Sequence, residues 1–150
     1  MTITTVTINA KDLIKKLEEF GKKNLEIRDE VLREVGNNLA NRIIKKTPVD
    51  TGLLRGSWKG GINSPNTDMS SSSVPDASLL FAGAKWGDTL FISNSQPYAV
   101  RIEFGFVNQT DSLGRTFSGP APANMIRGTL PFFDLILQES VNKVNAAGVI

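Results

Sequence analysis

The chain lacks both cysteine and histidine, although it is 150 residues long. Without cysteine it can form no disulfide, no thiolate nucleophile and no cysteine-ligated zinc or iron–sulfur cluster. Without histidine it can form no histidine-based catalytic triad, histidine metal site or imidazole pH switch. Any catalysis would therefore depend on carboxylate, lysine, tyrosine, serine or threonine side chains.

Long apolar segments are missing as well. No stretch reaches the ~18 consecutive apolar residues that a membrane span needs. Residues 1–16 contain no apolar core of signal-peptide length. We therefore expect a protein that is made in the cytoplasm and has no membrane partner.

The charge is small and unevenly distributed. Seventeen basic and 15 acidic residues give a net charge of +2, which is too little for a chain whose whole surface grips nucleic acid. Residues 1–60 carry 12 basic and 8 acidic side chains, whereas residues 61–150 carry 5 and 7. Hydrophobic residues make up 40% and charged residues 21%, which is near the globular average, and we expect one domain over residues 1–150.

A long helix is the strongest periodic pattern. Apolar residues recur at steps of three and four from residue 10 to about residue 46. Unbroken, this helix would be about 55 Å long at 1.5 Å per residue, which exceeds the width of a compact domain of this size. It must therefore bend, at Gly21 or at Gly36, or reach beyond its own core towards a neighbour.

The other predicted elements are shorter. In chain order they are a strand at 2–8, a strand at 57–62, an extended Ser/Pro-rich loop at 63–78, a hairpin of 79–84 with 89–93, a helix at 97–105, an extended loop at 107–124 and a helix at 130–145. Pro48 ends the long helix. This order predicts an α+β fold, in which a long N-terminal helix and a C-terminal helix pack on an antiparallel β-sheet.

Patterns that would indicate chemistry are absent or unspecific. The carboxylates are scattered along the chain, and no spacing in the sequence places two of them across a cleft, as acid–base hydrolysis would need. Lys59-Gly60-Gly61 and Gly114-Arg115 lack the spacing of a phosphate-binding loop. The lysine pairs of the long helix are interspersed with glutamates, which is typical of a solvated helix face. We expect no enzyme, no metal and no cofactor, and keep two alternatives: a DNA-binding module using the basic first helix, and a carboxylate-based hydrolase.

Two motifs carry a resemblance to a known family. The first runs Thr47-Pro48-Val49-Asp50-Thr51-Gly52-Leu53-Leu54-Arg55-Gly56-Ser57, and the second is Asn94-Ser95-Gln96-Pro97-Tyr98-Ala99 followed by Glu103-Phe104-Gly105. Over about residues 10–145 the chain resembles the minor tail, or tail-completion, proteins of the head–tail neck of tailed phages, whose first motif is Pro-Val-Asp-Thr-Gly-x-Leu-Arg-x-Ser. The matching residues, taken as candidate assembly residues, are Pro48, Asp50, Thr51, Gly52, Leu54, Arg55, Pro97, Tyr98, Glu103 and Gly105.

The resemblance implies a structural protein of the virion, at the head–tail junction or the top of the tail, assembled in the host cytoplasm. Its implied partners are further copies of itself in a homohexameric ring, with a twelvefold ring as the alternative, and neighbouring neck, connector, tail-tube or terminator proteins. Double-stranded DNA would pass through the lumen without sequence specificity. A tail terminator that caps the tube is the alternative role. The loops at residues 63–78 and 107–124 depart from the family pattern.

The motifs also have a physical interpretation. Asp50 and Thr51 can satisfy backbone donors where the chain turns after the long helix, and Gly52 permits close approach. Arg55 and Glu103 are candidates for a charge-assisted pair that would join the two motifs. The alternative is that both motifs hold the fold and the ring contacts lie elsewhere.

Overall fold

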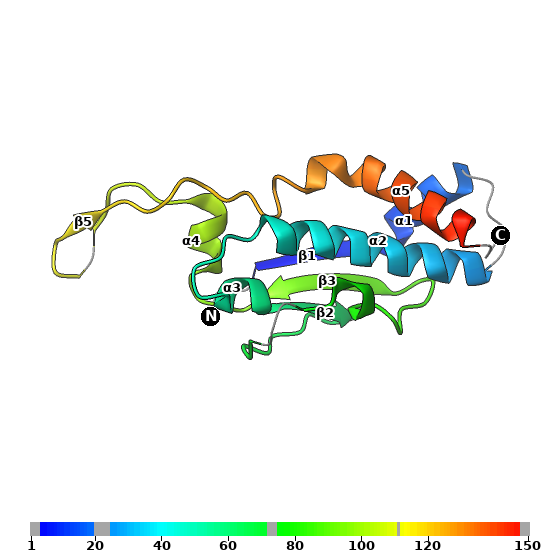
Figure 1. Ribbon diagram of the computed structural model, residues 1–150, viewed down its shortest axis with the longest axis horizontal. Coiled ribbons are helices and arrows are strands. Elements are labelled where there is room, and N and C mark those ends of the chain that lie inside the picture. Colours follow the sequence, from blue (N-terminus) through cyan, green and yellow to red (C-terminus); the bar gives the residue numbers. More distant parts are fainter. Residues whose placement is uncertain (1–3, 20–24, 72–74, 111, 148–150) are drawn as a thin grey trace.

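A computed structural model describes residues 4–19, 25–71, 75–110 and 112–147. It has the predicted α+β fold, in which helices cover a three-stranded antiparallel sheet (Figure 1). Its elements in chain order are β1 (Thr4–Asn9), α1 (Ala10–Glu19), α2 (Leu25–Lys46), α3 (Leu53–Gly56), β2 (Trp58–Ile62), η1 (Ala77–Leu79), β3 (Thr89–Asn94), α4 (Ala99–Phe104), β4 (Gln109–Thr110), β5 (Thr116–Phe117), η2 (Leu130–Phe132) and α5 (Phe133–Ala146).

β3 is the central strand of the sheet, whose strand order is β1-β3-β2. Both neighbours pair with β3 in antiparallel register, so that Val6 and Gly60 flank Ile92 from its two sides. Side chains alternate between the two faces of a strand, so Leu90 and Ile92 share one face, and both are fully buried. This face of the sheet forms one wall of the core.

α2 lies between the sheet and α5 and is therefore covered on two sides (Figure 1). This explains why its apolar stripe is wider than a single packing contact requires. The buried residues of the stripe are Val31, Leu32, Val35, Leu39, Ala40, Ile43 and Ile44. α2 continues through Gly36 without interruption. A Cβ there would lie 2.6 Å from Phe81 Cδ2 and 2.8 Å from Leu90 Cδ1. Glycine at this position allows α2 to approach the sheet closely.

The single helix predicted over residues 10–46 is divided into α1 and α2. The residues between them, including Gly21, lie outside the described ranges. α2 has 22 residues, which corresponds to about 33 Å at 1.5 Å per residue. It ends shortly before Pro48, as predicted. α1 packs against both β1 and α2. The predicted helix therefore does not extend past the core as one long rod; it is divided into two shorter helices that contact each other.

The predicted hairpin of residues 79–84 with 89–93 is wrong in its first strand. Residues 89–94 form β3, but the preceding apolar run forms η1 and a series of turns. Local hydrogen bonds determine this conformation: Asp76 accepts from Ser78 N at 2.9 Å, and Ala84 N donates to Phe81 O at 3.0 Å. Phe81 and Ala84 are both fully buried, so this apolar segment contributes to the core as a series of turns and not as a strand. β3 pairs with β1 and β2 instead.

The predicted loop over residues 107–124 is a hydrogen-bonded ribbon that projects beyond α4, away from the body (Figure 1). We call residues 105–124 the arm. Backbone hydrogen bonds join its outgoing and returning segments. Ala123 N donates to Ile102 O at the base and Gly119 N donates to Phe106 O further out, both at 2.9 Å. The short strands β4 and β5 pair near the tip. Backbone pairing therefore gives this polar segment a defined direction.

The Ser/Pro-rich segment, by contrast, follows the outer face of the sheet. Ser93 of β3 donates its hydroxyl to Asn66 O at 2.7 Å, and Lys59 of β2 reaches Ser70 Oγ at 3.4 Å. Asp68 accepts hydrogen bonds from the backbone and hydroxyl of Ser70. The part of this loop that is described is thus anchored on two strands. Within the described ranges, no helix combines the length and the apolar character needed to cross a membrane.

Candidate assembly surface

The first motif closes the C-terminal end of α2. Arg55 donates to the Thr47 carbonyl through Nη2 and Nε, at 2.7 and 3.1 Å, so two nitrogens of the guanidinium meet one oxygen. A cation is favourable at a helix C-terminus, where the last carbonyls have no helical partner. Thr47 Oγ1 donates to Ile43 O at 2.9 Å and accepts from Trp58 Nε1 at 2.7 Å. The motif therefore ties the helix end to the first residue of β2.

The predicted ion pair between Arg55 and Glu103 is wrong. Glu103 is only 1% exposed, and its carboxylate accepts from Ile126 N at 3.1 Å and from Arg127 N at 2.9 Å. The Arg127 side chain lies 3.8 Å from the same carboxylate. Arg55 and Glu103 each satisfy their charge on nearby backbone groups, so co-occurrence in two motifs did not mean contact.

Two amide side chains join the motifs instead. Asn94 Nδ2 donates to the Leu54 carbonyl at 2.8 Å, and Gln96 Nε2 donates to Ser57 Oγ at 2.9 Å. Both amide side chains are buried, where an unpaired polar group would be costly. Asn94 and Gln96 stand within the second motif as quoted, but they were not among the candidate residues.

Asp50 and Thr51 have little part in this hydrogen bonding. Thr51 Oγ1 accepts from Leu53 N at a long 3.3 Å, and among the described residues the carboxylate of Asp50 has no hydrogen-bond or ion-pair partner. Gly52 has φ +86°, and a Cβ at this position would have no described atom within 4 Å outside its immediate neighbours. Glycine is therefore required here by the left-handed backbone, and the predicted close approach is wrong.

The two motifs meet at a mainly apolar groove of about 490 Å³, which we call the motif groove. Its lining residues are Pro48, Val49, Asp50, Thr51, Gly52, Leu54, Tyr98, Ile102 and Pro120. Six of the ten candidate assembly residues are in this set, and Val49, which adjoins them, is 54% exposed. The other four do not line it: Arg55, Pro97, Glu103 and Gly105 shape the backbone around it.

The groove is electrostatically asymmetric. Partial burial raises the pKa of the Tyr98 hydroxyl above its ordinary value, and the nearby negative charge of Asp50 raises it further. Asp50 is the only charged residue among the groove's lining residues. A partner that fills this groove would therefore meet an apolar surface with a single negative charge.

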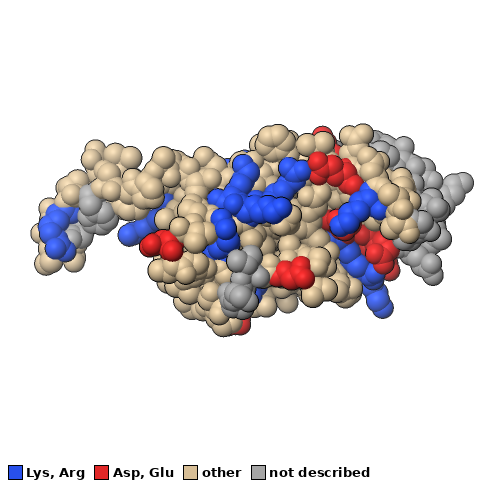
Figure 2. Space-filling model, in the orientation of Figure 1, with Lys and Arg blue, Asp and Glu red and all other residues tan. Residues whose placement is uncertain are grey.

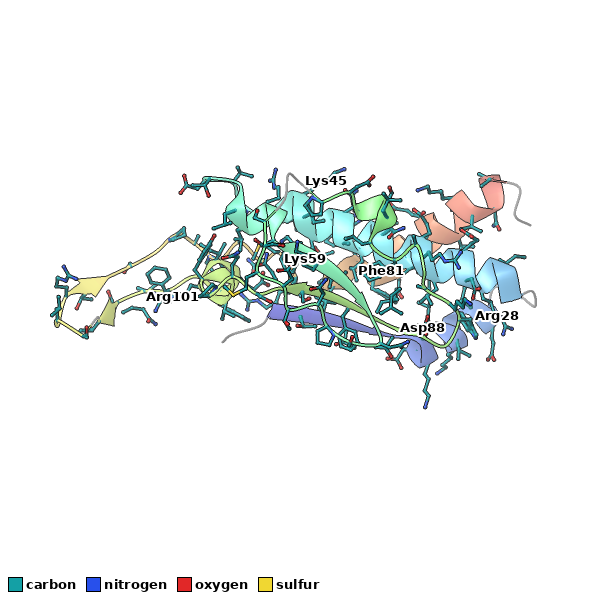
Figure 3. All side chains as sticks on the ribbon, turned by 90° about the horizontal axis from the view of Figure 1, so that it is seen from below. Arg28, Lys45, Lys59, Phe81, Asp88 and Arg101 are labelled. Atoms are coloured by element: carbon teal, nitrogen blue, oxygen red, sulfur yellow. The ribbon has the colours of Figure 1, made fainter. Side chains whose placement is uncertain are left out.

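The arm begins directly beside the groove. Gly105 has φ +66°, and a Cβ there would lie 2.9 Å from Pro122 Cδ and 3.0 Å from Pro120 O. Arg101 of α4 lies at the base of the arm (Figure 3), with its guanidinium 5.7 Å from the centre of the Phe106 ring. Glycine thus allows the outgoing and returning segments of the arm to come into contact at its base. Glu103 then holds Ile126 and Arg127, which follow the arm in the sequence.

Comparison with known families identifies this architecture. A family model described as "Bacteriophage HK97-gp10, putative tail-component" matches residues 11–105. The chain belongs to the HK97-gp10-like family. No curated protein and no solved structure matches it. The matched region contains both motifs and stops where the arm begins. The protein is therefore a structural component of the phage tail, located in the virion.

This tail component also has a basic groove of about 360 Å³ at the end of α2. The described residues that line it are Arg42, Lys45, Lys46, Thr129 and Phe132, none of which is acidic. Figure 2 shows basic side chains gathered across the middle of one face of the molecule. Arg42 is paired with Glu139 at 2.7 Å, whereas Lys45 and Lys46 have no ion pair among the described residues. The lysine pair at residues 22–23 of the predicted basic helix lies outside the described ranges.

Another hollow of the tail component, about 590 Å³, is lined mostly by polar residues and carries three carboxylates. Glu34 pairs with Lys143 at 2.8 Å, Glu139 pairs with Arg42, and Asp76 caps η1 through Ser78. Each carboxylate is thus engaged in holding α2, α5 or η1 in place. Within the described residues, no group of three or more acidic side chains could hold a metal ion.

Proposed function

We propose that this tail component acts at the head–tail connection, as a tail-completion or neck protein that forms a ring around the DNA channel and joins neck to tail. The arm is the observation that carries the proposal. It lies outside the core, and it exposes Val107 and Leu113 by 72% and 74%. A two-stranded ribbon is only marginally stable alone in water, so the arm is suited to contact another subunit.

Two unlike surfaces on one chain, the arm and the motif groove, support the proposed ring. The arm and the motif groove differ in shape, so a contact between them is heterologous, and such contacts close into rings when the rotation between subunits allows it. We expect a hexamer, with a twelvefold ring as the alternative. Neck or connector proteins on one side and tail-tube or terminator proteins on the other would be its neighbours.

The channel of such a ring must let DNA slide. Each phosphate contact with lysine or arginine strengthens binding through counterion release, without regard to sequence. The net charge of +2 supports a lumen that does not hold DNA tightly. In this proposal the protein works by its shape and its contacts, without catalysis, metal or cofactor.

Native mass spectrometry of the purified chain, alone and mixed with neighbouring tail proteins, tests the assembly. We expect a closed oligomer with six or twelve copies. A strictly monomeric chain at high concentration, even with tail proteins present, would refute the ring. An image of the virion at side-chain resolution tests the location: a ring that ends the tail tube would favour a terminator, and absence from the particle would refute both roles.

The basic groove favours one other function, a DNA-binding module. Lys45 and Lys46 are the residues that would contact phosphates. Gel shifts with duplex DNA, repeated from low to high salt, test this alternative against the Lys45→Glu/Lys46→Glu double variant. Salt-sensitive binding that the double variant loses would favour the module, whereas equal and weak retention of both proteins would count against it.

A further inference from the structure

We propose that the arm of one copy docks in the motif groove of the next copy in the ring. Val107 and Leu113 would meet the apolar lining, and Arg115 would lie beside Asp50. This inference rests on the proposed ring, because it needs a second copy of the chain. It assigns to the first motif a partner, namely residues 106–110 and 112–119 of a neighbouring subunit.

The arm is built to be held by something other than its own body. β4 and β5 are two residues each, and two such strands cannot bury their apolar side chains against one another. Val107 and Leu113 are among the most exposed large apolar residues described. Removing such side chains from water is favourable, so the tip gains from an apolar surface that receives it.

The arm cannot easily reach its own groove. Pro120, which lines the groove, belongs to the base of the arm, and from there the ribbon points away from the body (Figure 1). Leu113 is eight residues beyond Gly105 in the sequence, which allows a reach of about 26 Å at ~3.3 Å per residue. A tip held at that distance meets the surface of a different molecule.

The motif groove suits this tip in polarity and in charge. Its exposed lining is mostly apolar, with Val49 from the first motif and Ile102 from α4. The one charged side chain among its described lining residues is Asp50, whose carboxylate has no hydrogen-bond or ion-pair partner within the described residues. The basic residue of the arm is Arg115. Opposite charges at the rim of an apolar contact fix the register between the partners.

The arrangement also satisfies the stoichiometry of a ring. Each chain offers one arm and one groove, and the arm leaves the body beside the groove, so the contact runs in the same sense from copy to copy. A closed ring leaves no arm and no groove unoccupied. If a different protein filled the motif groove, the apolar tip of every arm in the ring would have no groove in which to dock.

Cysteine cross-linking in trans tests the contact, because the chain has no native cysteine. One sample mixes a Val49→Cys chain with a Leu113→Cys chain of different mass under mild oxidation, and a matched control mixes Leu79→Cys with Leu113→Cys. Leu79 is 67% exposed, but it lies on η1, away from the groove. We expect a strong mixed dimer in the first sample only. Equal yields in the two samples would overturn the docking.

A charge exchange provides a second, independent test. Asp50→Arg and Arg115→Asp should each weaken assembly in native mass spectrometry at low salt, by tenfold or more in the concentration needed. The double variant should recover most of that loss, whereas a double variant as weak as its parents would overturn the pairing. Circular dichroism of each variant establishes that it is folded.

The outcomes separate this inference from the proposed function. Rings of the unmodified chain together with the Val49–Leu113 cross-link support both. Rings without this cross-link, or a cross-link from Val49 to a neighbouring tail protein only, overturn the arm docking and leave the ring standing. A chain that stays monomeric in every mixture overturns the ring itself.

Discussion

Replacing Glu103 by glutamine should destabilise the protein, although the two side chains have nearly the same shape. The carboxylate accepts from Ile126 N and Arg127 N, one donor on each oxygen. Glutamine keeps one acceptor oxygen and turns an NH₂ group toward the second donor. An unpaired buried donor costs about 1–3 kcal/mol, and we expect a loss of about 2 kcal/mol. At about 2–4 °C per kcal/mol for a chain of this size, the Tm should fall by about 4–8 °C.

Urea unfolding followed by tryptophan fluorescence measures this effect, with wild type and variant at the same protein concentration because assembly also stabilises. The matched control is Glu30→Gln, which makes the same chemical change where Glu30 forms a partly exposed pair with Arg33. Surface pairs of this kind contribute about 0–1 kcal/mol. If Glu103→Gln were as stable as Glu30→Gln, the assignment of the buried carboxylate as the anchor of the segment after the arm would be refuted.

Three further predictions concern the same region. Thr47→Val removes the acceptor of the buried Trp58 N–H and should cost about 1–3 kcal/mol in the same unfolding assay; an unchanged midpoint would contradict it. Gly105→Ala places a Cβ at φ +66° and ψ 177°, a region that essentially only glycine adopts, and 2.9 Å from Pro122 Cδ. It should therefore cost about 1–3 kcal/mol and make the arm more sensitive to limited proteolysis than in wild type. Tyr98 is the only tyrosine, so absorbance near 295 nm reports its ionisation directly. Its pKa is raised by burial and by Asp50, and Asp50→Asn should lower it. The linked stability is complete below the ordinary tyrosine pKa and is lost as pH rises through the raised value; a titration that Asp50→Asn leaves unmoved would contradict the role of that charge.

The regular elements were predictable because their signals are local. The apolar stripe of α2 follows the helical period, and its end is determined by Pro48. α4 lies between Pro97 and Gly105, as predicted, although this glycine has φ +66° and ψ 177° and not the left-handed helical conformation that commonly ends a helix. The predicted strand over 57–62 and the predicted helix over 130–145 differ from β2 and from η2 with α5 by one residue at an end. The α+β class followed from these elements.

The turn that contains Phe81 and Ala84 was not predictable in the same way. A short apolar run without clear periodicity is compatible with either a strand or a buried turn. The cap from Asp76 favours the turn, but the pairing of β3 with both β1 and β2 excludes a third partner. That pairing joins residues far apart in the sequence, and no local pattern records it.

The candidate site was predicted in its residues but not in its contacts. The sequence identified both motifs, yet Arg55 and Glu103 bind backbone carbonyl and amide groups, which every residue possesses and which leave no trace in a sequence. The arm was predicted as an extended loop for the same reason: backbone hydrogen bonds hold its ribbon together within a polar, Gly/Pro-rich segment. Large apolar residues such as Val107 and Leu113, which are exposed, distinguish it from an ordinary polar loop.

The motif residues divide into two groups that act on assembly by different routes. Arg55 and Glu103 are committed to backbone groups, and Gly105 sets the exit of the arm, so changes there alter where the arm points. Val49 and Asp50 are exposed and make little contribution to the fold. Changes in the second group should therefore alter assembly at constant stability, while changes in the first should alter both together. Measuring the unfolding midpoint and the oligomer size on the same variants distinguishes residues that position the contact surface from residues that contact the partner directly.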